Sequence, residues 1–233
     1  MGFVIGDAMG VPLEFKSREE LLKKPVTKMI GYGTHNQPEG TWSDDTSMMI
    51  ATIDSINAKN GIDLYDIALK FAAFKNHAQY TPNREVFDIG GTCAKAIDKF
   101  EEAHEDPTQC GLTDINSNGN GSLMRILPIA YYAIAKKLKD FEILDLVRKI
   151  SSITHAHDIS VMGCYIYTRF AIFLLNGKDK YSAYSMTKCV DYTMFSAEAQ
   201  EAYNRLLKED ISKLTIKDIK SSGYIVDTLE AAI

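Results

Sequence analysis

The sequence has few of the residues that would tie a chain together covalently or anchor it in a membrane. Its four cysteines include no Cys-x-x-Cys pair, which argues against structural zinc and favours free thiols in a reducing compartment. Six prolines and 15 glycines among 233 residues exclude collagen-like and low-complexity classes. The longest charge-free apolar stretch, residues 126–135, contains Pro128 and is too short to span a bilayer.

The sequence also has no large excess of charge of either sign. Its 26 basic residues oppose 31 acidic ones and leave a net charge of −5, which gives no general attraction for nucleic acid or an anionic membrane. The N-terminal residues lack the basic segment of a secretory signal, and Asp7 follows closely. We therefore expect a cytoplasmic protein that binds neither nucleic acid nor membrane. The sequence carries no indication of an oligomeric state.

Helical periodicity dominates what the sequence does contain. Apolar residues recur at intervals of three and four in five segments, at about 48–56, 62–74, 138–150, 161–175 and 199–207. Ser196 is expected to cap the last segment, and Gly177 to terminate the fourth. Alternating patterns typical of strands are scarce. The sequence therefore predicts an all-α protein, built as a single compact multi-helix domain over residues 1–233.

Both ends of this domain are expected to be incomplete. Asp227 and the Glu230 three residues after it form a good helix start, yet the sequence stops at Ile233, well short of the ~11-residue mean helix. At the other end, apolar residues begin directly at Gly2 and Phe3, with no capping residue ahead of them.

Two acidic segments are candidates for metal binding or catalysis. Ser43, Asp44 and Asp45 stand in a run of oxygen-bearing side chains just ahead of an apolar helical pattern. Such residues cap a helix and complement its dipole, and adjacent carboxylates beside a hydroxyl also suit Mg²⁺. Glu14 follows a Gly-Asp-Ala-Met-Gly turn and a proline. It is either a surface residue behind a capped helix or a functional carboxylate.

Two further segments could bind a ligand. Residues 116–122 alternate asparagine, serine and glycine without the Gly-Lys-Ser/Thr ending of a Walker A loop. Small residues let backbone N–H groups approach a phosphate, but the same composition also makes an ordinary turn. His155 and His157 would point to different faces of a helix, so a joint metal site requires a loop there. A lone histidine is more often a hydrogen-bonded structural residue.

In their order and spacing, these segments resemble the ADP-ribosylglycohydrolase family. The matching stretches cover nearly the whole sequence and are GDAMGVPLEF, TWSDDTSMMI, FDIGGT, GNGSLMRILPIA, ITHAHD and SSGYIVDTLEAAI. The resemblance implies an all-α domain of the ADP-ribosylglycohydrolase type, two Mg²⁺ ions in a cleft, and hydrolysis of the bond between ribose C1 and an acceptor. The implied substrate is an ADP-ribosylated protein or a small ADP-ribose conjugate.

The resemblance also implies roles for particular residues. Ser43, Asp44 and Asp45 correspond to the first metal cluster of the family, and Glu14 to an acid near the metals and the substrate. Either Glu14 or Asp45 would position or deprotonate the attacking water. His155 would meet the distal ribose or a phosphate. The loop that holds the diphosphate and ribose corresponds to Ser117, Asn118, Gly119, Asn120 and Gly121.

The sequence departs from the family pattern in one respect. The Asp-x-Asp-Thr run of the second metal cluster occurs nowhere in the 233 residues. Because two carboxylates alone bind Mg²⁺ weakly, this departure predicts one bound metal or none, and slow turnover or none. The alternative to a Mg²⁺-dependent hydrolase is an impaired or inactive ADP-ribose-binding or structural member of the same fold.

Overall fold

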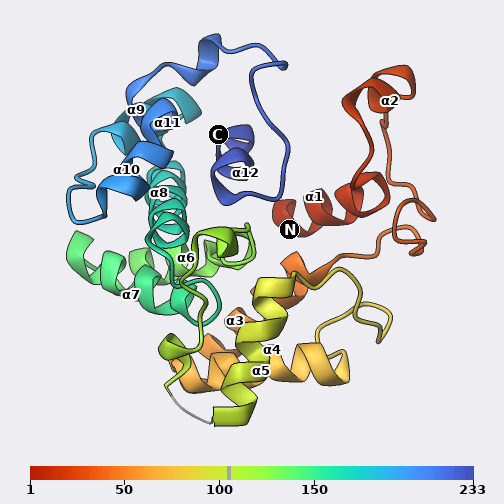
Figure 1. Cartoon of the computed structure of the whole chain (residues 1–233), viewed down its shortest axis with the longest axis horizontal. Coiled ribbons are helices and arrows are strands. Elements are labelled where there is room, and N and C mark those ends of the chain that lie inside the picture. The colour runs from red at the N-terminus through yellow and green to blue at the C-terminus, as the bar shows by residue number, and fades with distance from the viewer. Residues whose placement is uncertain (104–105) are drawn as a thin grey trace. The chain divides into compact units, whose positions relative to one another are not determined.

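The regular structure of this chain is helical. A computed structural model describes residues 1–103 and 106–233, and in these ranges it contains helices and two isolated β-bridges but no strand. The predicted all-α class is therefore confirmed. The chain divides into two compact units, residues 1–89 and residues 90–233 (Figure 1). The single domain expected over residues 1–233 stays a prediction beside this division.

The first unit is organised around the contact of α3 with α4, and α1 also packs on α3. Ser43 and Asp63 cap the N-termini of α3 and α4 by accepting backbone N–H groups, as small polar residues do at this position. Its elements are α1 (Gly2–Gly10), the 3-10 helix η1 (Val11–Leu13), α2 (Arg18–Lys23), α3 (Asp44–Lys59) and α4 (Leu64–His77).

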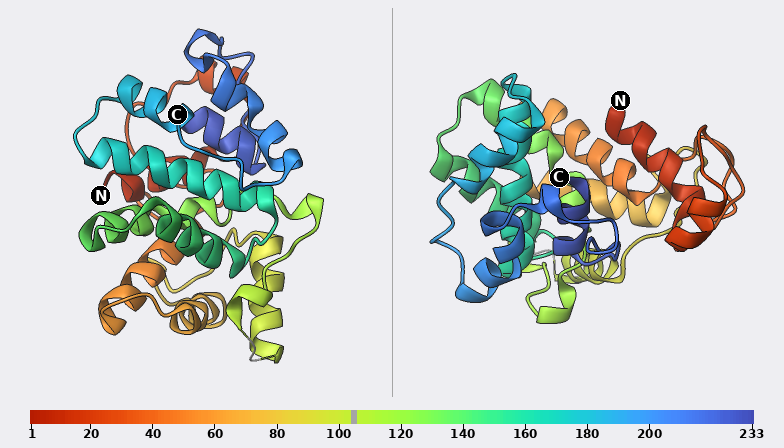
Figure 2. Two further views of the ribbon diagram at one scale, coloured as in Figure 1. Left: turned by 90° about the vertical axis from the view of Figure 1, so that its left-hand side faces the viewer. Right: turned by 90° about the horizontal axis from the view of Figure 1, so that it is seen from above.

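The helices of the second unit pack around one of their number, α8, which contacts α6, α7, α9, α10 and α12 (Figure 1 and Figure 2). Helix α8 is long and apolar enough to cross a membrane, but 72% of it is buried, as expected of a core helix. The α-helices of this unit are α5 (Gly91–Ala103), α6 (Leu127–Lys136), α7 (Asp140–Ser152), α8 (Asp158–Leu175), α9 (Lys180–Lys188), α10 (Ala197–Ala202), α11 (Asn204–Lys208) and α12 (Ile225–Ala232).

Helix ends with a clear capping residue agree with the sequence pattern. Ser196 accepts the backbone N–H of Ala199 and begins α10. Gly177 has a φ of 82° just beyond the end of α8, a left-handed conformation that glycine adopts without strain. Both predicted helix ends are confirmed.

Other predicted boundaries are wrong. Helix α12 begins at Ile225 rather than Asp227, because Asp227 accepts a hydrogen bond from Ser222 and Glu230 pairs with Arg205 instead of closing a capping box. The predicted helix at 199–207 is two helices, α10 and α11. Helices α5, α6 and α9 lie outside the predicted segments. In α6, Pro128 occupies the first turn, where a missing N–H costs no hydrogen bond.

We expect Gly163→Ala to destabilise the second unit. A Cβ on Gly163 would lie 2.2 Å from the Tyr203 hydroxyl and 3.0 Å from Ile225 Cδ1. Tyr203 is fully buried and donates to the Ile159 carbonyl, so it cannot move aside without losing that bond. The free energy of unfolding in urea should fall by about 2 kcal/mol. The control is Gly6→Ala, where a Cβ meets nothing within 4 Å; an equal loss in both variants would contradict this packing argument.

Candidate functional site

The start of α3 is held by a carboxylate from α1. Asp7 accepts the backbone N–H groups of Ser43 and Thr46, each at 3.1 Å. Ser43 in turn accepts the N–H of Asp45 at 3.2 Å, and its hydroxyl lies 3.2 Å from Asp45 Oδ2. The unsatisfied N–H groups of a helix N-terminus favour such anionic partners. The Ser-Asp-Asp turn is therefore fixed before any ligand binds to it.

Carboxylates accumulate around this turn. Asp44 is buried, and burial, followed by the charges of Asp45, Asp88 and Asp7, raises its pKa well above the usual range. Burial also raises the pKa of Asp45 to about 7, and the charges of Asp7, Glu14 and Asp88 add to this while the hydrogen bond with Ser43 opposes it. Burial is the largest cause of both shifts, and the charges of the neighbouring carboxylates add to it.

The donors fit a hard divalent cation. Ser43, Asp44 and Asp45 offer only oxygen, the ligand atom that Mg²⁺ prefers, and a cation here would offset the repulsion that raises both aspartate pKa values. In the same helical turn, Thr46 Oγ1 is buried without a hydrogen-bond partner among the described residues. These residues could therefore hold Mg²⁺.

Glu14 belongs to a second group of side chains, completed by His35 and Asp88. His35 Nε2 lies 2.6 Å from Glu14 Oε2 and 3.8 Å from Asp88 Oδ2. Burial, followed by the hydrogen bond and charge of Glu14, raises the pKa of Asp88 to about 6, whereas the charge of His35 lowers it. Phe15 and Phe87 place their rings 5.9 and 5.3 Å from the His35 ring, which fixes the imidazole opposite Glu14.

The backbone around this group is unusual. Phe15 and Asp88 have φ values of 61° and 60°, in the left-handed region that few residues other than glycine, asparagine and aspartate enter. The Thr34 hydroxyl donates to the Glu14 carbonyl at 2.6 Å. The segments that carry Glu14, His35 and Asp88 are thus shaped to bring their side chains within hydrogen-bond reach of one another.

The sequence reasoning missed Asp7, His35 and Asp88. Asp7 and Asp88 lie in two of the segments that match the family, GDAMGVPLEF and FDIGGT, but no role was predicted for either carboxylate. No sequence pattern pointed to His35, because it lies in a turn-rich loop where no periodicity predicts the direction of its side chain. The first unit does bring together the four predicted residues Glu14, Ser43, Asp44 and Asp45, since the charge of Glu14 raises the pKa of Asp45.

The predicted nucleotide loop lies in the second unit and is tied to α8 and α12. The Asn118 side chain accepts the Ser160 hydroxyl at 2.7 Å, and the Asn118 carbonyl accepts the N–H of Ile225 at 3.0 Å. Asn120 donates its N–H to the Gly223 carbonyl and its amide to Thr228. The asparagines therefore build the loop, and these particular side chains already have partners.

His155 lies against the glycines of this loop. A Cβ on Gly121 would be 2.8 Å from His155 Cε1, and one on Gly119 would be 3.9 Å from His155 Nε2. Thr154 Oγ1 accepts from Arg125 at 2.7 Å and lies 2.8 Å from His155 Nδ1. With its oxygen accepting from Arg125, the threonine hydroxyl is able to donate to Nδ1 of a neutral ring that carries its proton on Nε2.

The His155 ring is neutral at physiological pH. Burial, with a contribution from the charge of Arg125, lowers the pKa of His155 to about 3. It can offer a hydrogen bond toward the glycine loop but no positive charge. His157 instead caps α8 by accepting the N–H of Ile159, so the two histidines do not act as a pair.

Comparison with known proteins gives one consistent family. The sequence profile of the ADP-ribosylglycohydrolase family matches residues 1–233. An ADP-ribosylarginine hydrolase Tri1 from Pseudomonas putida is 30% identical over 235 residues, covering 100% of this chain and 58% of that protein. The corresponding protein of Serratia proteamaculans is 28% identical, and the chain covers 59% of its length.

A third relative and a solved structure extend the comparison. The ADP-ribosyl-[dinitrogen reductase] glycohydrolase of Rhodospirillum rubrum is 30% identical over 237 residues, covering 100% of this chain and 70% of that protein. A solved ADP-ribosylglycohydrolase-related protein complex contains a chain with a TM-score of 0.74 and 21% identity, covering 99% of this chain and 71% of the other. The helical fold is therefore the fold of that structure, and the chain spans under three fifths of the two Tri1 hydrolases.

The carboxylate cluster predicts how stability depends on pH without divalent cations. Raised aspartate pKa values mean that the folded chain holds more protons than the unfolded chain between about pH 4 and 7. In EDTA, the free energy of unfolding should fall by about 2 kcal/mol between pH 5 and pH 8 through Asp45 alone. The only tryptophan, Trp42, precedes the turn and reports unfolding of the first unit by fluorescence.

The Asp45→Asn variant should lose the part of this pH dependence that comes from Asp45, whereas Glu39→Gln, at an exposed acid of the same unit, should keep it. Adding Mg²⁺ should stabilise the wild-type chain more at pH 8 than at pH 5. A wild-type stability that rises with pH in EDTA would contradict the interpretation of the cluster.

Proposed function

Because this chain belongs to the ADP-ribosylglycohydrolase family, we propose that it hydrolyses the bond between ribose C1 and an arginine side chain of an ADP-ribosylated protein, with Mg²⁺. The arginine linkage is supported by the two Tri1 relatives, which are ADP-ribosylarginine hydrolases. The observation that carries the proposal is the acidic turn of the first unit, where burial, together with the charges of neighbouring carboxylates, raises the pKa values of Asp44 and Asp45, and where Glu14 is one of the carboxylates that act on Asp45.

Ser43, Asp44 and Asp45 would hold the metal. When bound, Mg²⁺ supplies a Lewis acid that lowers the pKa of a water and orients ribose oxygens. The carboxylates also give the site a negative potential, which favours the oxocarbenium-like transition state of glycosidic cleavage. Asp7 contributes by holding the turn through Ser43 and Thr46 rather than by contacting substrate.

Glu14 is the proposed general base. Its side chain is 39% exposed, so water can reach it, and the His35 contact at 2.6 Å fixes one carboxylate oxygen. The C1–N bond would break, with its electron pair going to nitrogen, as the oxygen of the attacking water bonds to C1 and Glu14 takes the proton of that water. The released guanidine takes up a proton from solvent. His35 acts as a positioning residue for this step.

In the second unit, the loop from Ser117 to Gly121 and His155 would hold the nucleotide part of the substrate. Gly121 gives His155 the room to lie against the loop, because a Cβ there would be 2.8 Å from His155 Cε1. His155 would donate a hydrogen bond from Nε2 to a ribose or phosphate oxygen. Its lowered pKa keeps the ring neutral, so it would add no positive charge. The contribution here is therefore shape and hydrogen bonding rather than charge.

One observation favours a second candidate function. No Asp-x-Asp-Thr run occurs in the 233 residues, and Mg²⁺ bound by few protein ligands depends on substrate oxygens for the rest of its coordination. The second candidate is an ADP-ribose-binding protein of the same fold with little or no turnover. It predicts nucleotide binding that is independent of Mg²⁺ and of Asp44 and Asp45.

The deciding experiment measures release of free ADP-ribose from ADP-ribosylarginine by the 233-residue chain in Mg²⁺ and in EDTA. We expect activity in Mg²⁺ alone, and a loss of two orders of magnitude or more, roughly, in Asp44→Asn because the acidic turn then has one carboxylate fewer. The matched control is Asp54→Asn on the same helix, where the acid pairs with Lys70 and activity should persist. Binding of ADP-ribose without Mg²⁺-dependent hydrolysis would favour the second candidate.

Glu14 and His35 are expected to affect kcat differently. Glu14→Gln removes the base and should lower kcat by about 10²–10⁴-fold, whereas His35→Gln should lower it less because only the position of Glu14 is lost. In both variants KM should change little, since neither group is proposed to hold the nucleotide. An unchanged kcat in Glu14→Gln would assign the base to Asp45 instead.

A further inference from the structure

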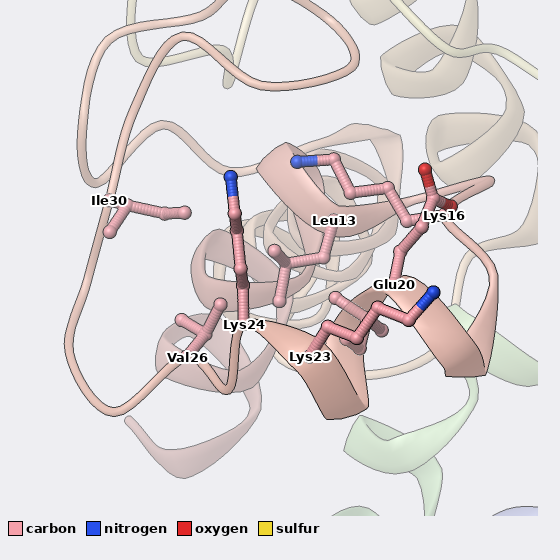
Figure 3. A pocket seen from close by; sticks show the side chains of 8 residues that line it. Leu13, Lys16, Glu20, Lys23, Lys24, Val26 and Ile30 are labelled. Atoms are coloured by element: carbon pink, nitrogen blue, oxygen red, sulfur yellow. The ribbon is translucent and has the colours of Figure 1, made fainter.

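A pocket of about 400 Å³ lies in the first unit, apart from the acidic turn. Its volume is within the range of small-ligand pockets. The floor is apolar, and Figure 3 shows Leu13, Val26 and Ile30 with the lysine side chains around them. All of its lining comes from one stretch of the chain, and consists of Leu13, Lys16, Glu20, Leu21, Lys23, Lys24, Val26 and Ile30.

The pocket carries positive charge in an acidic chain. Residues 16–28 contain five basic and two acidic side chains, although the whole chain has a net charge of −5. Glu20, the acid of the lining, is engaged by the backbone N–H and hydroxyl of Ser17 at 2.8 and 2.9 Å in a capping box. Lys16, Lys23 and Lys24 form no ion pair with any residue that the structure describes.

Large apolar side chains are also exposed on the same stretch of the chain. Phe15, Leu22 and Tyr32 are 81%, 71% and 71% exposed, and all three lie in or beside the stretch that forms the lining. Exposed apolar groups gathered in one place are typical of surfaces that contact another molecule.

The pocket is coupled to the proposed base through two neighbouring segments. Leu13 and Lys16 flank Glu14 in the sequence, and Ile30 belongs to the loop that carries His35. The backbone of this loop packs closely against the segment before Glu14, since a Cβ on Gly33 would lie 2.0 Å from the Pro12 carbonyl oxygen. A molecule in the pocket is therefore held next to the residue that precedes Glu14.

From these observations we propose that the pocket binds the acceptor: an acidic segment of the ADP-ribosylated protein, near its modified residue, that also carries an apolar side chain. This assignment rests on the proposed hydrolase function. Carboxylates of the segment would pair with Lys16 and Lys24, and its apolar side chain would cover Leu13, Val26 and Ile30. An inorganic anion would leave the apolar floor bare, and a neutral hydrophobe would leave the ammonium groups without counter-charge.

The hydrolysis test uses two synthetic peptides, each ADP-ribosylated on a central arginine. One has aspartate and leucine around the arginine and the other lysine and leucine; free ADP-ribosylarginine is the reference. Wild-type kcat/KM should favour the acidic peptide by about tenfold at low salt. In the Lys16→Ala/Lys24→Ala variant this preference, measured relative to ADP-ribosylarginine, should disappear. Lys28→Ala, an exposed lysine outside the lining, should retain it.

A binding measurement separates the pocket from the hydrolase function. Fluorescence anisotropy of the labelled, unmodified acidic peptide should show binding to the wild-type chain that weakens with salt and is lost in the double variant. Hydrolysis of ADP-ribosylarginine without this binding or preference would overturn the pocket assignment and leave the proposed function intact. Peptide binding without hydrolysis of any substrate would contradict the proposed function and the acceptor role. An oligonucleotide of equal charge that competes fully would also overturn the assignment, since the apolar floor would then have no role.

Discussion

Burial of carboxylates close to one another is the constraint on which the first unit depends. Asp44 and Asp45 begin α3, where burial and the charges of other acids raise their pKa values, and two backbone N–H groups at the same helix end hold Asp7. The helix end therefore offsets one negative charge and leaves the others without a counter-charge among the residues that act on them. Under the proposed function, this local cost in stability keeps the site suited to a cation.

In the second unit the buried charge is positive rather than negative. Arg125 is fully buried, and its donors reach the Ile150 carbonyl and Thr154 Oγ1. The threonine hydroxyl then lies against His155, which is kept neutral by burial and by the guanidinium. A buried cation is thus linked through Thr154 to a histidine that lies against the glycine loop. One unit concentrates carboxylates at a helix start, whereas the other buries a guanidinium and keeps the nearby histidine neutral.

The sequence predicts most of this because much of the site consists of adjacent residues. Ser43, Asp44 and Asp45 form one turn whose capping chemistry is local, and the glycine loop is recognisable from composition. His35 and Asp88 could not be predicted, since their closeness to Glu14 depends on long loops with left-handed residues. Helix α6 was missed for a similar reason: Pro128 interrupts an apolar run in the sequence, yet in the fold it marks a helix start.

The backbone at Asp88 has a further consequence for how this position can change over evolutionary time. A φ of 60° there admits glycine, asparagine and aspartate at little cost, but penalises most other side chains, glutamate included. A carboxylate close to Glu14 and His35 is also present at this point. Of the three residues that this conformation admits at little cost, aspartate is the one with a carboxylate. Asparagine or glycine at position 88 would keep the backbone conformation of the loop and discard the negative charge beside Glu14 and His35.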